Sequence, residues 1–419
     1  MTEHTALPPS DAPPPRTTFP PPGLMHLGPR PPQVFVRGQG AWLWDDAGRR
    51  HLDWVQGWAV NTLGHAPAAV ADALARQAGT LLQAGPGFYN DRAIALAQRL
   101  AALSGLERCF IGTSGAEANE GAIKLARKWG QRHKAGAATV LSFGGSFHGR
   151  TLATMAASGK PGFARLFAPA VPGFRHLPFN RLDGLAAALA EPDVCAVIVE
   201  PVQGEAGVVE AAPGFLPALR ALCDAHRVLL VADEVQTGIG RCGTLFAHTQ
   251  WDVQPDIVTL GKGLGGGVPV GAVLAREAVC CLEPGDQGGT YHGNALACAA
   301  ALAVLDAVTA PGFLDQVQAA GEQLAAGLVR LAARHGLGGP GAVHGRGLLR
   351  ALQLPPGLAS GLLADAARAP AGGGDGLLVN PAQPQRLRLM PALNTRADEV
   401  EHGLALLDAA LAEVAVPAA

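Results

Sequence analysis

The sequence predicts an α/β protein with a large domain, built on a mostly parallel sheet covered by helices, and a smaller α+β domain. Short, continuously apolar runs recur through the middle of the chain, and helical stretches separate several of them. Strands buried on both faces have this composition, and the intervening helices supply the crossovers of a parallel sheet. After about residue 310, long Ala- and Leu-rich helices flank two short strands, which predicts the smaller domain.

The predicted elements follow in order along the chain. Residues 34–65 alternate apolar and polar side chains between turn residues, as short antiparallel strands do, and residues 67–82 and 91–103 repeat apolar residues with helical spacing. The apolar runs of the predicted sheet are RCFIGT (108–113), TVLSFG (139–144), CAVIVEP (195–201), VLLVADE (228–234), DIVTLGK (256–262) and VGAVLA (270–275). Further helices are expected at 118–134, 213–227, 313–336 and 397–414.

These patterns divide the chain into four segments. We expect a Pro-rich disordered tail over residues 1–32 and an N-terminal segment, 33–75, that packs with the small domain. The large domain is expected at 76–310 and the small C-terminal domain at 311–419. The tail lacks the apolar core of a signal peptide, and no apolar run approaches the roughly 18 residues that span a bilayer. We therefore expect a soluble, cytoplasmic protein.

Composition argues against some classes of partner. The chain has 32 Lys and Arg against 34 Asp and Glu, a formal charge of −2, so no global field attracts nucleic acid or an anionic membrane. Seven cysteines occur without a C-x-x-C spacing. An odd number in this pattern favours reduced, buried thiols over disulfides or zinc, and no metal is expected.

Three predicted strands end in residues that can carry chemistry, and ligands of open α/β sheets lie beyond the carboxyl ends of the strands. The first strand leads through the small residues Ser114, Gly115 and Ala116 into a helix. Free backbone N–H groups at a helix start attract an anion such as a phosphate. An ordinary Ser-capped helix is the alternative explanation of this segment.

The second strand, VLLVADE, brings two carboxylates, Asp233 and Glu234, to the end of an apolar run. A buried carboxylate must be paired or ligated. Asp233 is therefore a candidate to bind a metal, to act as a general base or to pair with a protonated heterocycle. No His and Asp cluster supplies the further ligands of a metal. A loop of helix-capping acids is the alternative.

The third strand leads to Lys262, which stands between two glycines that leave room for a bulky group. Desolvation lowers the pKa of a lysine and makes it a nucleophilic amine, although a surface-loop lysine is the commoner case. Together, an anion site, an acid that can pair with a ring nitrogen and an amine that can form an imine meet the needs of pyridoxal phosphate.

Ordered motifs from about residue 34 to the C-terminal region carry a resemblance to a known family. They are LWDDAGRRHLDWVQGWAVNTLGH, TSGAEANEGAIKLARKWG, SFHGRTLATMAASGKPGF, EPVQGEAGV, LLVADEVQTGIGR, PDIVTLGKGLGGGVPVGA and GGTYHGNALACA. The sequence resembles the class III (fold type I) pyridoxal-phosphate aminotransferases, and within them the acetylornithine aminotransferases. The resemblance implies a fold type I architecture with pyridoxal 5'-phosphate in the large domain.

The resemblance also implies cofactor contacts. Lys262 resembles the lysine that holds the cofactor covalently, Asp233 the acid that pairs with the pyridine nitrogen, and Gln236 the residue at the ring hydroxyl. The other implied contacts are Ser114, Gly115 and Ala116 at the phosphate, Phe147 on the ring face, and Thr290 at the phosphate in the partner subunit's site. Simple core packing is the alternative for Phe147. The role implied for Thr290 requires a homodimer with shared active sites.

Substrate contacts follow from the same resemblance. 2-Oxoglutarate has two carboxylates, and the arginine fork binds a carboxylate in a bidentate way. Arg388 resembles the arginine for the α-carboxylate, and Arg150 the arginine for the distal carboxylate. Glu205 resembles the switch glutamate that neutralises Arg388 when an ω-amine donor binds, with a solvated loop acid as the alternative. Tyr89 is expected to gate the pocket.

The implied reaction is transamination between N2-acetylornithine and 2-oxoglutarate, which gives N-acetylglutamate 5-semialdehyde and glutamate in arginine biosynthesis. The family alternatives are aminotransferases for succinyl-diaminopimelate, ornithine or 4-aminobutyrate, and an aminomutase. A non-catalytic binding module of the same fold is a further alternative, against which intact Lys262, Asp233 and Gln236 argue. The segment GTYHGNAL differs from the sequence that is usual in the family at this place. Its residues Tyr291 and His292 are expected near the dimer interface, and no substrate preference is assigned to them.

Overall fold

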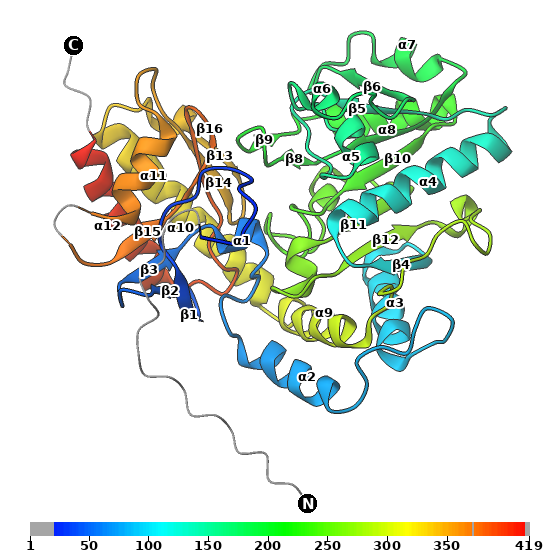
Figure 1. Cartoon of the computed structure of the whole chain (residues 1–419). Coiled ribbons are helices and arrows are strands. Elements are labelled where there is room, and N and C mark those ends of the chain that lie inside the picture. Colours follow the sequence, from blue (N-terminus) through cyan, green and yellow to red (C-terminus); the bar gives the residue numbers. More distant parts are fainter. Residues whose placement is uncertain (1–20, 371–372, 415–419) are drawn as a thin grey trace, which may run out of the picture.

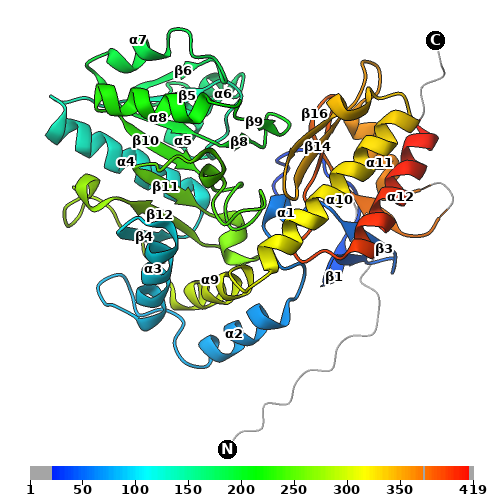
Figure 2. The ribbon, with the colours of Figure 1, turned by 180° about the vertical axis from the view of Figure 1, so that it is seen from behind.

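A computed structural model describes residues 21–370 and 373–414. Most of the predicted Pro-rich tail, residues 1–20, lies outside this range. Figures 1 and 2 show two bodies of secondary structure. One surrounds a seven-stranded sheet, and the other combines the first strands of the chain with its C-terminal elements.

The seven-stranded sheet has the order β4-β12-β11-β10-β7-β5-β6. Its strands are β4 (Arg108–Gly112), β5 (Thr139–Phe143), β6 (Phe174–Leu177), β7 (Val194–Val199), β10 (Leu229–Asp233), β11 (Ile257–Leu260) and β12 (Gly271–Ala275). Neighbours are parallel, except that β12 is antiparallel to both β4 and β11. All six predicted apolar runs form strands here, which confirms the mostly parallel sheet; the short edge strand β6 was not predicted.

Helices cover both faces of this sheet. Helix α4 (Gly115–His133) packs Ala118 and Ala122 against one face, in a cluster that includes Ile198 and Val231. Val197 and Leu230, the neighbours of those residues, belong to the cluster on the opposite face, because successive strand side chains alternate. The other helices around the sheet are α2 (Ala68–Ala78), α3 (Asp91–Ser104), α5 (Leu152–Ala157), α6 (Phe163–Leu166), α7 (Leu185–Ala190), α8 (Phe215–His226) and α9 (Ala295–Val308), with 3-10 helices η1 (Ala247–Trp251), η2 (Lys262–Gly265) and η3 (Glu277–Val279).

The second body contains two four-stranded sheets, β1-β2-β3-β15 and β13-β14-β17-β16. Strand β15 pairs in parallel with β3, so segments from both ends of the chain share one sheet. The strands are β1 (Phe35–Gln39), β2 (Trp42–Asp45), β3 (Arg50–Asp53), β13 (Val343–Arg346), β14 (Leu349–Gln353), β15 (Gly376–Leu378), β16 (Asn380–Gln383) and β17 (Arg386–Leu389). The helices are α1 (Gln56–Ala59), α10 (Phe313–Arg334), α11 (Ser360–Arg368) and α12 (Ala397–Glu413), with the 3-10 helix η4 (Gly339–Ala342). A hairpin of β8 (Val202–Gln203) and β9 (Val209–Glu210) completes the elements.

The expected domain boundaries at residues 32, 75 and 310 remain predictions. Within the described part of the chain, no single helix is long and apolar enough to cross a membrane; α9 and α10 reach that length and composition only as a pair bent by 74°. All seven cysteines are unpaired, and five of them are buried. The expectation of buried thiols is wrong for Cys280, which is exposed, and Cys109 is only partly buried.

Candidate active site

The three segments singled out in the sequence meet at one edge of the large sheet. Strands β4, β10 and β11 point in the same direction, so their carboxyl ends lie at the same edge of the sheet. A Cβ atom on Gly261 would lie 2.9 Å from the Cα atom of Gly115, and one on Gly115 would lie 2.4 Å from Cγ1 of Val235. Glycine at both positions therefore allows the start of α4 to touch the turn that carries Lys262.

Lys262 follows β11 as the first residue of η2. Its φ of +39° lies in the left-handed region, which side chains with a Cβ rarely adopt and which clusters at functional sites. Burial lowers the pKa of Lys262, and the nearby Arg388 lowers it further, against the opposing effect of three carboxylates. The amine is thus shifted towards its neutral, nucleophilic form.

Asp233 ends β10 and is 3% exposed. Its Oδ2 accepts hydrogen bonds from Nδ2 of Asn119 (2.8 Å) and Nδ1 of His148 (2.7 Å), and its Oδ1 accepts from the backbone N–H of Val235 (3.0 Å). Thr259 orients the amide by donating to Oδ1 of Asn119 (2.7 Å). The three donors together fix the orientation of the Asp233 carboxylate.

Glu200 follows β7 and is 5% exposed. Its Oε1 accepts the backbone N–H of Phe147 (2.9 Å), which fixes the segment that carries Phe147 and His148. Burial raises the pKa of Glu200 to about 7, although His148 acts in the opposite direction. The half-buried ring of Phe147 lies 6.2 Å from that of Phe163, centroid to centroid.

Glu234, next to Asp233 in the chain, belongs to a different network. It is 1% exposed and accepts from Oγ1 of Thr237 (2.9 Å), from the backbone N–H groups of Ala247 (2.8 Å) and His248 (2.7 Å), and from Nδ1 of His248 (2.8 Å). These bonds cap the start of η1, so Glu234 holds this loop in place.

Arg388 lies on β17 of the smaller body and is fully buried. Its Nη2 donates to Oε1 of Glu205 (2.8 Å) and Oδ1 of Asn380 (2.8 Å), and its Nη1 donates to Oε1 of Gln236 (3.2 Å). Burial raises the pKa of Glu205, but Arg388 and the other nearby cations outweigh this and hold it below its usual value. Arg388 thus joins the two bodies through Glu205 and Gln236.

The remaining predicted contacts within one chain lie around this cluster. Ser114 caps α4 by accepting the backbone N–H of Glu117 (3.2 Å), and Gly115 and Ala116 are the first residues of the helix. Arg150 is exposed, with its guanidinium carbon 5.8 Å from the ring centroid of Phe147. Ser114 to Ala116, Phe147 and Arg150 all remain predicted ligand contacts.

The structure does not bring Thr290 and Tyr89 to Lys262 within one chain. Thr290 is exposed, and its carbonyl accepts from Nε2 of Gln83 (2.6 Å). Tyr89 is 92% exposed beside a cavity lined by Phe110 and His292 among others, not by the residues around Lys262. The role expected for Thr290 requires a partner chain, and this role and the gating role expected for Tyr89 stay predictions.

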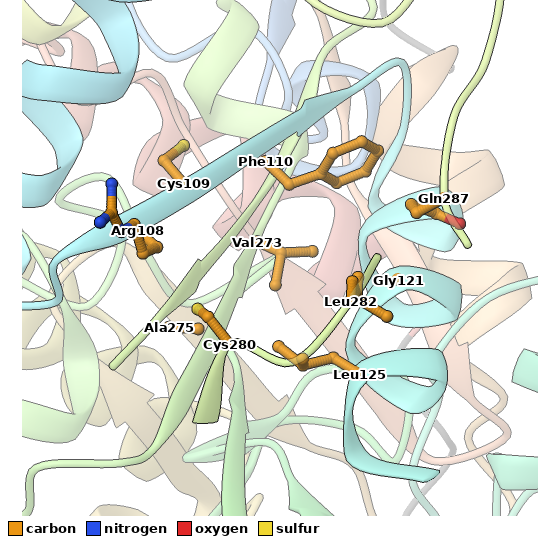
Figure 3. Close-up of a pocket in the computed structure, with 10 residues that line it drawn as sticks. All are labelled: Arg108, Cys109, Phe110, Gly121, Leu125, Val273, Ala275, Cys280, Leu282 and Gln287. Atoms are coloured by element: carbon orange, nitrogen blue, oxygen red, sulfur yellow. The ribbon is translucent and has the colours of Figure 1, made fainter. Parts of the chain in front are cut away.

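A second, largely apolar pocket lies between β4, β12 and α4 (Figure 3). Phe110, Leu125 and Val273 are among its lining residues, and none of the predicted site residues lines it. In the described ranges, no group of three or more His, Cys, Asp or Glu side chains is placed to hold a metal ion.

Sequence reasoning missed the supporting residues Asn119, His148, Glu200 and Thr259. Each lies at the carboxyl end of a strand, on the loop that follows one, or in the second turn of α4. That position is the only signal in the sequence, and it does not reveal which of many polar residues turns inward.

This chain belongs to the class III aminotransferase family: residues 27–411 match the family described as aminotransferase class-III, which confirms the predicted family. The family and its fold define a pyridoxal-phosphate-dependent aminotransferase and imply pyridoxal phosphate as the cofactor.

Individual relatives are similar over nearly their whole length. Acetylornithine aminotransferase 2 of Bordetella bronchiseptica is 52% identical over 391 residues, which cover 93% of this chain and 97% of that protein. The crystal structure of N-acetylornithine aminotransferase from Stenotrophomonas maltophilia K279a has a TM-score of 0.78 at 41% identity, covering 91% of this chain and 96% of that one. The ornithine aminotransferase of Toxoplasma gondii, with partial occupancy of PLP at its active site, has a TM-score of 0.88 at 32% identity, covering 94% and 92%.

Proposed function

We propose that this protein transfers the δ-amino group of N2-acetylornithine to 2-oxoglutarate, giving N-acetylglutamate 5-semialdehyde and glutamate. In the biosynthetic direction the flow reverses and serves arginine synthesis in the cytoplasm. The acetylornithine aminotransferases at 52% and 41% identity support this assignment. The main structural support for this function is the contact between Arg388 and Glu205. A buried cation with a replaceable counter-ion suits an enzyme that binds one substrate with a carboxylate on the reacting carbon and one without it.

The residues around Lys262 fit pyridoxal phosphate. When bound, the cofactor withdraws electrons from the substrate carbon next to the transferred nitrogen. Asp233, oriented by Asn119 and His148, would pair with the protonated ring nitrogen. The N–H groups at the start of α4, from Ser114 to Ala116, would bind the phosphate, and the amine of Lys262 would hold the cofactor and carry the proton.

Arg388 and Arg150 form the two carboxylate sites of this proposal. Arg388 binds the α-carboxylate of glutamate or 2-oxoglutarate, and Arg150 binds the distal carboxylate. The reacting δ-carbon of N2-acetylornithine bears no carboxylate, so Glu205 stays on Arg388 when this donor binds. Without Glu205, the fully buried guanidinium of Arg388 would be unpaired in the complex with N2-acetylornithine, which would cost free energy.

A homodimer completes the site in this proposal. Thr290 and Tyr89 would reach the partner's cofactor and pocket from a surface that is exposed in the single chain. Large apolar side chains on or near these segments are also exposed, namely Leu82 (54%), Phe88 (77%), Tyr89 (92%) and Tyr291 (64%). Exposed apolar groups of this kind mark surfaces that partners cover.

A two-substrate assay tests the proposed function. Glutamate formation from 2-oxoglutarate is measured with N2-acetylornithine, ornithine, succinyl-diaminopimelate and 4-aminobutyrate as donors. We expect the highest kcat/KM with N2-acetylornithine and no turnover of the Lys262→Ala variant. A higher value for another donor would reassign the substrate. Turnover of an amino acid without any acceptor would indicate an aminomutase.

A further inference from the structure

The two carboxylate oxygens of Glu205 face different cations. Oε1 lies 2.8 Å from Nη2 of Arg388, and Oε2 lies 3.9 Å from Nζ of Lys160. The side chains of Glu205 and Lys160 are 23% and 35% exposed, so water screens the second pair only partly. Glu205 therefore has a second positive charge within reach if it leaves Arg388.

The backbone of Lys160 is held close to the segment that carries Phe147. The preceding residue, Gly159, donates its N–H to Oγ of Ser146 (2.9 Å), one residue before Phe147. The ammonium of Lys160 lies 5.9 Å from the ring centroid of Phe147 and 5.5 Å from that of Phe163. These rings and Glu205 hold the side chain on the Glu205 side of the site.

The backbone of Glu205 is fixed as well, because Nε2 of Gln383 donates to its carbonyl oxygen (2.7 Å). A departure from Arg388 is therefore a rotation of the side chain and not a movement of the loop. An incoming α-carboxylate and a displaced Glu205 with no new partner would repel each other, since both are negative. A nearby ammonium reduces that repulsion.

We propose that Lys160 is a positioning residue that receives Glu205 when a substrate α-carboxylate takes its place at Arg388. This inference rests on the proposed role of Arg388 in the two half-reactions. If the proposal holds, Lys160 affects the binding of the two kinds of substrate differently. Binding of 2-oxoglutarate and glutamate displaces Glu205 and depends on Lys160, whereas N2-acetylornithine leaves Glu205 on Arg388.

The first test compares Lys160→Met, which keeps the apolar stem, with Lys160→Arg, which keeps the charge. In the holoenzyme, Lys160→Met should raise the KM for 2-oxoglutarate about threefold to fivefold without lowering kcat, as the loss of a partly exposed ion pair does. The KM for N2-acetylornithine should change less than about twofold on the same grounds. Lys160→Arg should restore the KM for 2-oxoglutarate. An equal loss for both substrates would mean that Lys160 binds the distal carboxylate itself, and no change for 2-oxoglutarate would also overturn the proposal.

A double-mutant cycle gives the second test. If Lys160 acts through Glu205, Lys160→Met should have no further effect on 2-oxoglutarate in a Glu205→Gln background. An undiminished effect there would contradict the proposal. Equilibrium titration with glutarate, a dicarboxylate that cannot react, provides a readout independent of turnover: its Kd should rise in Lys160→Met by the same factor. A wild-type protein that binds glutarate but transfers no amine would refute the proposed function and leave the role of Lys160 to be decided by this titration.

Discussion

Asp233 and Glu234 are adjacent in the sequence, yet their carboxylates lie in two separate hydrogen-bond networks. Asp233 accepts from Asn119 and His148 at the edge where Lys262 lies. Glu234 accepts from the backbone and side chains at the start of η1. Successive residues at a strand end point to opposite sides, so the same dipeptide supplies one residue to the site and one to its support.

Asp233→Asn should abolish most of the activity, because an amide cannot provide the negative charge that pairs with the ring nitrogen. We expect kcat to fall at least about 100-fold, the size of effect seen when a fixed charge partner of a reaction is lost. Single-turnover measurement of the half-reaction with N2-acetylornithine checks this. A variant within tenfold of wild type would remove Asp233 from the assigned role.

Glu234→Ala should mainly reduce stability. The substitution leaves the N–H groups of Ala247 and His248 without their acceptor in a buried place, at a cost of about 3–5 kcal/mol in the free energy of unfolding. Urea unfolding of the cofactor-free proteins measures the cost, and activity per folded molecule should stay close to wild type. A stable but inactive variant would assign Glu234 to the chemistry instead.

Glu205→Gln should separate the two substrates. A neutral amide cannot balance the buried Arg388 when an ω-amine donor binds, so the KM for N2-acetylornithine should rise by about tenfold or more. Binding of 2-oxoglutarate should be unchanged or tighter, because its carboxylate no longer competes with Glu205. Arg386→Gln is the matched control, since Arg386 lies on the same strand and its side chain donates one hydrogen bond within the described ranges, to the carbonyl of Gly207 (3.4 Å). An equal effect of Glu205→Gln on both substrates would argue against the exchange.

Glu200→Gln should change how stability depends on pH. The pKa of Glu200 is raised from 4.5 to about 7 on folding, so between these values the folded protein binds more protons than the unfolded chain. Wild-type stability therefore falls as the pH rises through this window, and the contribution is constant above it. The glutamine side chain does not titrate, so the variant lacks this pH-dependent contribution. Its free energy of unfolding relative to wild type should therefore rise by about 1–3 kcal/mol between about pH 5 and pH 8. Parallel pH series of urea unfolding, both without cofactor, check the sign. A constant difference would show that Glu200 is not a buried acid of raised pKa.

The sequence is informative about the large sheet and less so about the packing around it. Continuous apolar runs predicted six of the seven strands, since buried strands have a simple composition. Helix α9 was not predicted because ALACAAALAVLDAV has almost no polar face, and a helix buried on all sides shows no periodicity. The short strand β6, FRHL, is a half-exposed edge that lacks the apolar signal of its neighbours.

The same limit applies to the site. Asp233 and Lys262 were predicted because a charge at the end of an apolar strand is conspicuous. Asn119 and His148 lie 114 and 85 residues from the carboxylate to which they donate, and such long-range contacts leave no mark in a local pattern. The sequence likewise did not indicate that Lys160 lies beside Glu205, because only folding brings the two side chains together.

The most direct test of the whole account is a pair of half-reactions on the protein loaded with pyridoxal phosphate. The visible absorbance of the bound cofactor is followed after N2-acetylornithine is added, and again after 2-oxoglutarate is added. We expect rapid loss of the absorbance with the first substrate and its recovery with the second. A loaded protein whose absorbance changes only with another donor would contradict the proposed substrate, and a protein that never acquires the absorbance would contradict the assignment of Lys262 and Asp233 to the cofactor.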